Sequence, residues 1–197
     1  MSVQNDYIHL PATAGLSETT SRARLTWTTI LTIAAVGASL ALSCVTPFAA
    51  LAVALAGTVG LRQSLRAVAI VWLANQFVGF VFFHFPLTAN AFLWGVVMGI
   101  AAFLTTIVAA IVTKYASSST LILRLAVPLL ASFAVYELIL LVAAIFLGSL
   151  ETFRPSIVAQ LAWINAASFL GMIVLNELAA AIGKRWVGKM PRLARSY

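Results

Sequence analysis

Two long stretches without a charged residue constrain the fold of this chain most strongly. Residues 25–61 and 67–113, 37 and 47 residues long, contain no Asp, Glu, Lys or Arg. A helix that crosses the hydrocarbon core of a bilayer needs about 20 residues. Each stretch is therefore too long for one spanning helix and predicts two. Pro47 divides the first stretch and Pro86 the second, because proline ends one helix and starts the next.

The composition supports a membrane protein. Of the 197 residues, 62% are hydrophobic and 9% are charged, with a mean hydropathy of +1.05. About 25% of the residues of a soluble domain are charged, and a soluble fold of this size could not hide so much apolar surface. This excludes a soluble enzyme and a disordered protein. Cys44 is the single cysteine, which also excludes a disulfide framework and a cysteine-based zinc site.

We predict an all-α integral membrane bundle of six transmembrane helices joined by short loops. The chain then divides into a cytoplasmic tail (1–24), a six-helix domain (25–183) and a basic cytoplasmic tail (184–197). The expected helices cover residues 25–45, 48–61, 67–85, 88–113, 121–149 and 156–183.

The positions of the basic residues predict the orientation. With the N-terminus inside, eleven of the twelve Lys and Arg residues fall in inner segments and only Arg154 falls outside. Inner loops are enriched in Lys and Arg, so both chain ends are expected in the cytoplasm. The net charge of +7 is then a topology signal, and we expect no nucleic-acid partner.

Three polar residues at membrane depth are candidate contacts to a substrate. Asn75 and Gln76 lie near the middle of the helix expected at 67–85, where they either face a substrate or hydrogen-bond a neighbouring helix. Glu137 lies near the centre of the helix expected at 121–149. An acid at this depth is a candidate for substrate binding or coupling, and the alternative is a structural bond to one of the two amides.

Aromatic and polar residues gather in the predicted outer half. They form either an aromatic belt at the membrane surface or an outward-facing pocket, and an apolar cavity with a few polar groups is the usual form of a small-molecule site. We predict the pocket. Its candidate substrate-binding residues are Asn75, Gln76, His84, Asn90, Trp94, Glu137 and Trp163.

His84 is the candidate metal ligand. A free metal ion needs three or four ligands, which the sequence does not supply, whereas a pre-formed cobalt corrin needs one axial ligand. His84 could provide it, as could Cys44, and the alternative for His84 is a residue of the aromatic belt. No catalytic motif is present, so we expect neither an enzyme nor an intrinsic cofactor.

The first expected helix carries a small-residue ridge. In IAAVGASLAL, Ala34 and Ala38 are four residues apart, a spacing that lets helices pack closely. With six spans and inside termini, the chain resembles the substrate-binding S-components of energy-coupling-factor vitamin transporters. The resemblance implies that Ala34 and Ala38 dock onto a transmembrane coupling subunit driven by ATPases. It also implies a vitamin held near the outer face.

Two segments give a narrower resemblance. VWLANQFVGF (71–80) and FPLTANAFLWG (85–95) resemble bacterial S-component-like proteins linked to cobalamin uptake, some of which work without ATPases and some of which bind cobalt through a cysteine. Cys44 does not match the position of that cysteine.

We therefore expect a multi-pass protein of the bacterial cytoplasmic membrane that takes up a vitamin or cofactor, with cobalamin as the ligand. The alternatives are an accessory or assembly subunit without transport activity, and a proton-coupled carrier of small solutes that uses Glu137.

Overall fold

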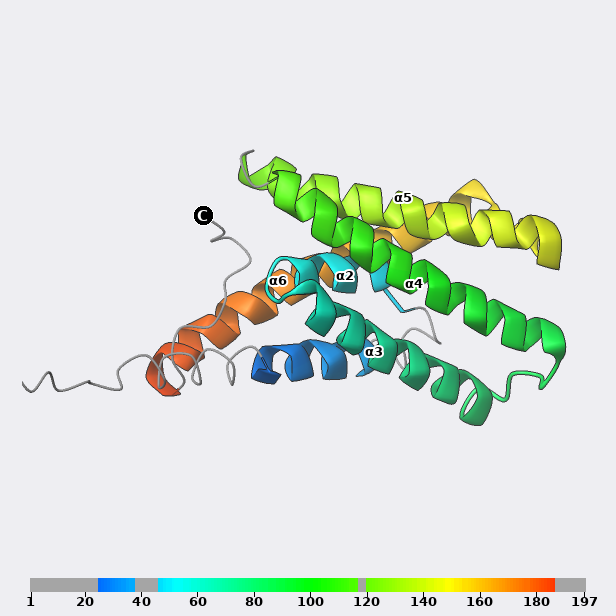
Figure 1. Cartoon of the computed structure of the whole chain (residues 1–197), viewed down its shortest axis with the longest axis horizontal. Helices are drawn as coiled ribbons and strands as arrows, with labels where there is room; N and C mark the ends of the chain where they lie inside the picture. The colour runs from blue at the N-terminus through cyan, green and yellow to red at the C-terminus, as the bar shows by residue number, and fades with distance from the viewer. Residues whose placement is uncertain (1–24, 38–45, 117–119, 187–197) are drawn as a thin grey trace, which may run out of the picture.

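The computed structural model describes residues 25–37, 46–116 and 120–186, which form helices and connecting turns and contain no strand. This confirms the predicted all-α class. Figure 1 shows the arrangement. The elements are the helix Leu25–Gly37, α2 (Phe48–Ala56), α3 (Leu61–Val81), α4 (Ala89–Tyr115), α5 (Leu121–Leu147), the 3-10 turn η2 (Leu150–Phe153) and α6 (Pro155–Trp186).

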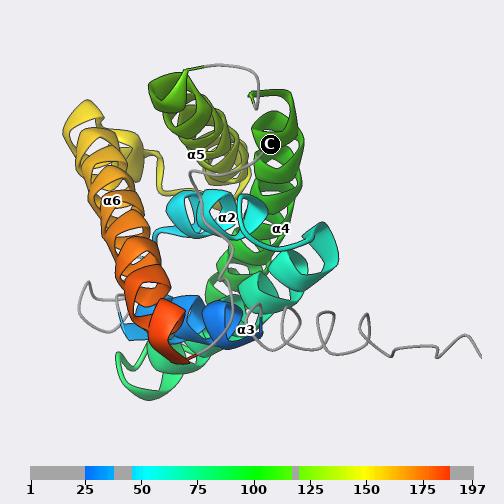
Figure 2. The same cartoon turned by 90° about the vertical axis from the view of Figure 1, so that its left-hand side faces the viewer.

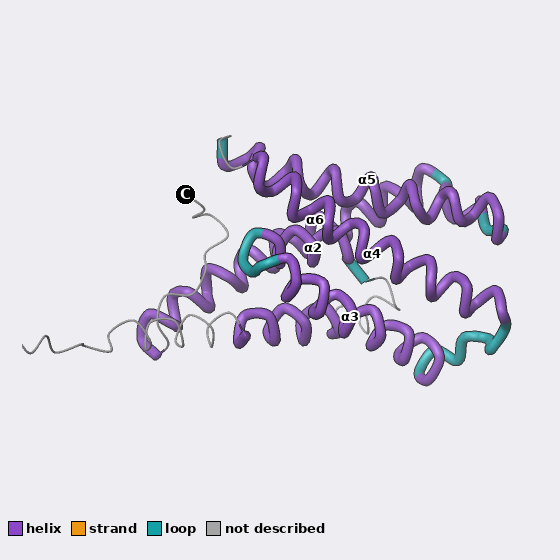
Figure 3. The backbone as a smooth tube through the Cα atoms, viewed as in Figure 1, coloured by secondary structure: helices purple, strands orange, loops and turns teal. Residues whose placement is uncertain are grey.

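Four of these helices are long and apolar enough to cross a bilayer: α3, α4, α5 from Ile122, and α6 as far as Leu178. Successive helices of these four run in alternating directions through the molecule (Figures 1 and 3). Thr88 caps α4, because its side-chain oxygen accepts a hydrogen bond from the Ala91 amide at 3.3 Å. These four helices indicate a membrane protein.

The core of the bundle lies around α2. Every residue from Phe48 to Leu55 is buried. Viewed from one end, α2 sits in the middle of the bundle, among α3, α4, α5 and α6 (Figure 2). Trp27, Val71 and Phe169 from three other helices join it in one apolar cluster. A helix of nine residues is about 14 Å long, too short to cross a bilayer of about 30 Å.

Side chains from two other helices accept hydrogen bonds from groups at the start of this buried helix. Asn165 of α6 accepts a hydrogen bond from the Ala50 amide at 3.2 Å, which caps the first turn of α2 from outside. Thr46, just before Pro47, donates its hydroxyl hydrogen to Asn75 Oδ1 of α3 at 2.8 Å. Both bonds are buried, where an unpaired polar group is costly.

The expected number of six spans is not confirmed. The helix expected at 48–61 ends at Ala56, so α2 cannot cross the membrane alone. The helix expected at 25–45 is described only as Leu25–Gly37, which is also short, and residues 38–45 lie outside the described residues. Four spans, like six, would leave both chain ends on one side.

Two helix boundaries differ from expectation, because charged residues were taken as helix breaks. The third expected helix (67–85) begins at Leu61 and includes Arg62 and Arg66. Arginine is a good helix former, and its long side chain can leave the hydrocarbon from a helix end. The sixth expected helix extends to Trp186, three residues into the expected tail. The expected tails 1–24 and 187–197 lie outside the described residues.

Basic residues gather at one end of the bundle, which we call the basic end. Arg62 lies in the first turn of α3, Lys114 in the last turn of α4 and Arg124 near the start of α5. The alternating helix directions bring these three positions to the same end. Arg154 follows η2 at the opposite end. The described residues therefore reproduce the charge asymmetry of the sequence.

Candidate functional site

Two glycines of α4 let α3 approach closely. Trp72 of α3 donates its indole hydrogen from Nε1 to the Gly95 carbonyl oxygen at 2.9 Å. A Cβ atom at Gly99 would lie 2.8 Å from Cε2 of the same indole. A Cβ atom at Gly95 would lie 2.6 Å from Oε1 of Gln76. The Gly95-x-x-x-Gly99 spacing thus fixes how the α3–α4 hairpin packs.

A groove of about 470 Å³ opens between α3 and α4, toward the end opposite the basic end. Its walls are apolar except for Gln76, whose Nε2 atom is buried and has no hydrogen-bond partner among the described residues. Phe80 and Phe92 stack across the groove with their ring centroids 4.9 Å apart. Its size suits part of a small apolar or aromatic molecule. The lining residues are Trp72, Leu73, Gln76, Phe77, Phe80, Val81, Leu87, Phe92, Gly95 and Val96.

His84 lies in the loop that joins α3 to α4, at the same end as the groove. It is exposed and adopts a left-handed backbone conformation with φ of 53°. Its Nδ1 lies 3.1 Å from the Phe82 carbonyl oxygen. A carbonyl can only accept, so Nδ1 is the donor in this bond, and in a neutral ring with this tautomer Nε2 is the nitrogen with a lone pair.

Exposed phenylalanines surround this loop. The Phe85 amide donates to the Gly79 carbonyl oxygen at 3.1 Å, so the loop folds back onto the end of α3. Phe82, Phe83 and Phe85 are all exposed. The loop thus presents one histidine among apolar rings.

Three other predicted contacts do not line the groove. Asn75 is 5% exposed and accepts the bond from Thr46, so it holds the start of α2. This bond corresponds to the alternative given for Asn75, which was a structural hydrogen bond in place of a contact to a substrate. Asn90 is exposed and Trp94 is half-buried, and both lie on α4 next to the groove without lining it.

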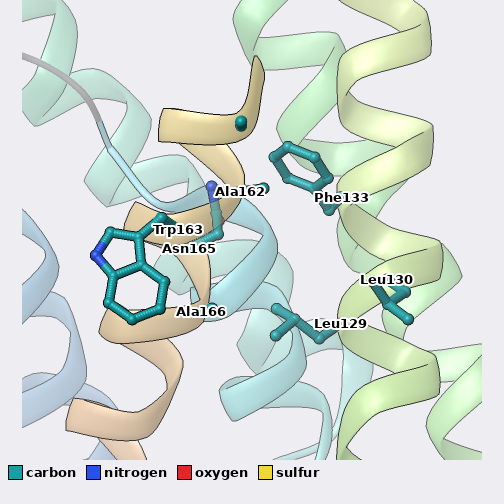
Figure 4. A pocket seen from close by; sticks show the side chains of 8 residues that line it. Leu129, Leu130, Phe133, Ala162, Trp163, Asn165 and Ala166 are labelled. Atoms are coloured by element: carbon teal, nitrogen blue, oxygen red, sulfur yellow. The ribbon is translucent and has the colours of Figure 1, made fainter. Parts of the chain in front are cut away.

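Trp163 lines a second site, a crevice of about 400 Å³ between α5 and α6. Leu129 and Phe133 project into this crevice from α5 (Figure 4). Trp163 is 73% exposed, and its ring lies on the side of α6 away from Phe133. Asn165, which caps α2, also lines the crevice. The structure thus separates Trp163 from Gln76.

Glu137 lies on α5, one turn beyond Phe133, and is half-buried. Within the described ranges it makes no hydrogen bond and no ion pair, so the structural bond to Asn75 or Gln76 that was the alternative for this residue is not formed. Its position near the middle of a spanning helix makes it the acid at membrane depth that the sequence indicated.

The docking candidates are described only in part. Ala34 is half-buried on the helix Leu25–Gly37, whereas Ala38 and Cys44 lie outside the described residues. In the described portion of the chain, no three His, Cys, Asp or Glu side chains come together as a metal site.

Of the seven predicted contacts, Gln76 lines the α3–α4 groove and Trp163 lines the α5–α6 crevice, so these two residues do not share one pocket. Sequence reasoning missed the Gly95–Gly99 pair and the cap that Asn165 provides. The glycine pair has a readable signal, because glycine at four-residue spacing in an apolar helix marks a packing face.

Comparison with protein-family models, with characterised proteins and with solved structures finds no match to this chain.

Proposed function

We propose that this chain is a multi-pass membrane protein that takes up a vitamin or cofactor, with cobalamin as the ligand, and that it works as an S-component does. The observation that carries the proposal is the exposed His84, whose Nε2 is left free by the bond from Nδ1 to the Phe82 carbonyl oxygen. A neutral imidazole is a good ligand for cobalt.

The distribution of basic residues supports an outward-facing position for this site. If the basic end faces the cytoplasm, as inner loops do, the loop from Phe82 to Thr88 faces outward. An uptake protein must meet its ligand on that side. The apolar rings beside His84 and the α3–α4 groove offer flat surface to a large ring system. The groove is too small to enclose a corrin, so the ligand would lie across the loop and enter the groove only in part.

The test is visible absorbance of aquocobalamin titrated with the purified protein. Replacement of the cobalt-bound water by imidazole changes the spectrum, and we expect this change with the wild type. His84→Ala should remove it. His9→Ala is the matched control, because His9 is the chain's other histidine, and it should behave as the wild type. The same spectrum for wild type and His84→Ala would contradict ligation by His84.

The resemblance to S-components adds an expectation about docking onto an ATPase-driven coupling subunit. If Ala34 and Ala38 form the docking ridge, leucine at both positions should abolish uptake while the purified protein still binds its ligand, because larger side chains keep the backbones apart. Full uptake by this double variant would favour a solitary transporter.

A second candidate function, a proton-coupled carrier of small solutes, is favoured by Glu137. This half-buried carboxyl group lies in a spanning helix and has no partner among the described residues. Ionisable groups at such depth are costly and are commonly kept for ion or proton movement. Uptake that depends on a proton gradient and that is lost in Glu137→Gln would favour this function.

A further inference from the structure

A third groove, of about 620 Å³, lies at the basic end, between the helix Leu25–Gly37 and the first half of α3. Gln63 of α3 donates from Nε2 to Thr28 Oγ1 at 2.8 Å, which joins the two helices. Both helices begin at the basic end and run in the same direction (Figure 1). The groove therefore follows the two helices from that end toward the middle of the bundle.

Two arginines lie at the entrance of this groove. Arg62 and Arg66 both line it, are exposed, and lie one turn apart on the same face of α3. Neither forms an ion pair with any acidic side chain that the structure describes. Two guanidinium groups one turn apart can bind one phosphate group between them, because each presents a fork of donors.

Isoleucines line the groove toward the middle of the bundle. Thr29 and Thr32, which also line it, donate their hydroxyl hydrogens to carbonyl oxygens of their own helix. Ile70 lies eight residues after Arg62, which is about 12 Å further along the helix. Ile33 lies equally far along the helix that begins at Leu25. Ile33 and Ile70 line the groove and are 67% and 56% exposed. A cationic entrance and an apolar interior match the two parts of a phospholipid.

We propose that this groove binds an anionic phospholipid, with the phosphate between Arg62 and Arg66 and an acyl chain along Ile33 and Ile70. Basic pockets between helices at the cytoplasmic surface bind anionic headgroups, and each basic residue contributes about 1 kcal/mol. If the basic end lies at the membrane surface, the groove reaches from there into hydrocarbon depth, which fits a lipid better than a protein segment. The proposal does not depend on the ligand bound near His84.

The test is native mass spectrometry of the purified full-length protein, titrated with phosphatidylglycerol or with phosphatidylcholine. The wild type should bind phosphatidylglycerol more tightly. In the double variant Arg62→Gln/Arg66→Gln the affinity for phosphatidylglycerol should fall about thirtyfold. Arg154→Gln, at the opposite end, should leave it unchanged. Equal binding of both lipids by the wild type, or unchanged binding by the double variant, would overturn the proposal.

Two further measurements separate the contribution of the two arginine charges from that of the contacts to the acyl chain of the lipid. Arg62→Lys/Arg66→Lys keeps both charges and should keep the preference for phosphatidylglycerol; loss of that preference would count against the site. Millimolar inorganic phosphate should not displace the lipid, since it makes no acyl contacts. Displacement would indicate a site for a soluble anion instead.

The remaining occupant to test is the chain's own N-terminal segment. Residues 1–24 contain Asp6 and Glu18, which could also meet the two arginines. The full chain should bind phosphatidylglycerol without removal of this segment. Binding only after deletion of residues 1–24 would assign the groove to that segment and overturn the lipid proposal.

Discussion

Gly99→Ala tests the packing that creates the α3–α4 groove. The added Cβ would lie 2.8 Å from Cε2, 3.0 Å from Nε1 and 3.1 Å from Cζ2 of Trp72. The indole cannot move away freely, because its Nε1 donates to the Gly95 carbonyl oxygen at 2.9 Å. The new methyl group must therefore separate the helices, break this hydrogen bond, or both.

The expected loss of stability combines two costs and one gain. Overpacking costs about 1–3 kcal/mol, and the lost hydrogen bond costs about 1 kcal/mol. The higher helix propensity of alanine returns at most about 1 kcal/mol. We therefore expect the free energy of unfolding to fall by about 1–3 kcal/mol in Gly99→Ala. Unfolding in mixed detergent micelles, followed by circular dichroism, measures it.

Gly171→Ala is the matched control. Gly171 lies on α6, and a Cβ atom there would meet nothing within 4 Å. This substitution keeps the propensity gain without the clash, so its stability should equal or exceed that of the wild type. If Gly99→Ala proves as stable as Gly171→Ala, the close approach of Trp72 to α4 is wrong.

Three further outcomes follow from the structure. Asn165→Ala should lower the free energy of unfolding by about 1–3 kcal/mol in the same assay, because the Ala50 amide would be left buried and unpaired; unchanged stability would contradict the cap. Reporter fusions near Pro86 and at Tyr197 should report opposite sides of the membrane, because of the charge asymmetry; the same side for both would remove the proposed orientation. If Glu137 carries a proton, Glu137→Gln should abolish any proton-gradient dependence of uptake; retained dependence would exclude it.

The sequence predicted the long helices well, because their length and apolar composition alone decide them. Helices were expected at 88–113 and 121–149, and α4 and α5 cover Ala89–Tyr115 and Leu121–Leu147. Pro86 and the polar loop before Leu121 are strong local signals. Such signals depend on a few neighbouring residues and therefore do not depend on the tertiary arrangement.

The sequence predicted α2 poorly, because burial inside a bundle is not visible from hydropathy. An apolar stretch after Pro47 reads equally as a span and as a helix enclosed by other helices. What decides is the pairing of Thr46 and the Ala50 amide, at the start of α2, with Asn75 and Asn165, which lie 29 and 115 residues away in the chain. No local pattern encodes such partners.

The candidate site divided for the same reason. Periodicity and charge can indicate an expected membrane depth, which is the outer half for Trp94 and Trp163 and the middle of the helix for Gln76. Membrane depth does not determine toward which neighbouring helix a side chain points. The packing of α3 on Gly95 and Gly99 turns Gln76 into one groove, while Trp163 lies at another.

Corrinoid uptake by living cells tests the central claim most directly. A bacterial strain that requires cobalamin and lacks its own inner-membrane transporter would express the chain, with membrane insertion checked by immunoblot. We predict that the wild type and His9→Ala restore growth on limiting cobalamin and that His84→Ala does so poorly. Absence of growth with the inserted wild type, in strains with and without an energy-coupling module, would contradict a cobalamin uptake function.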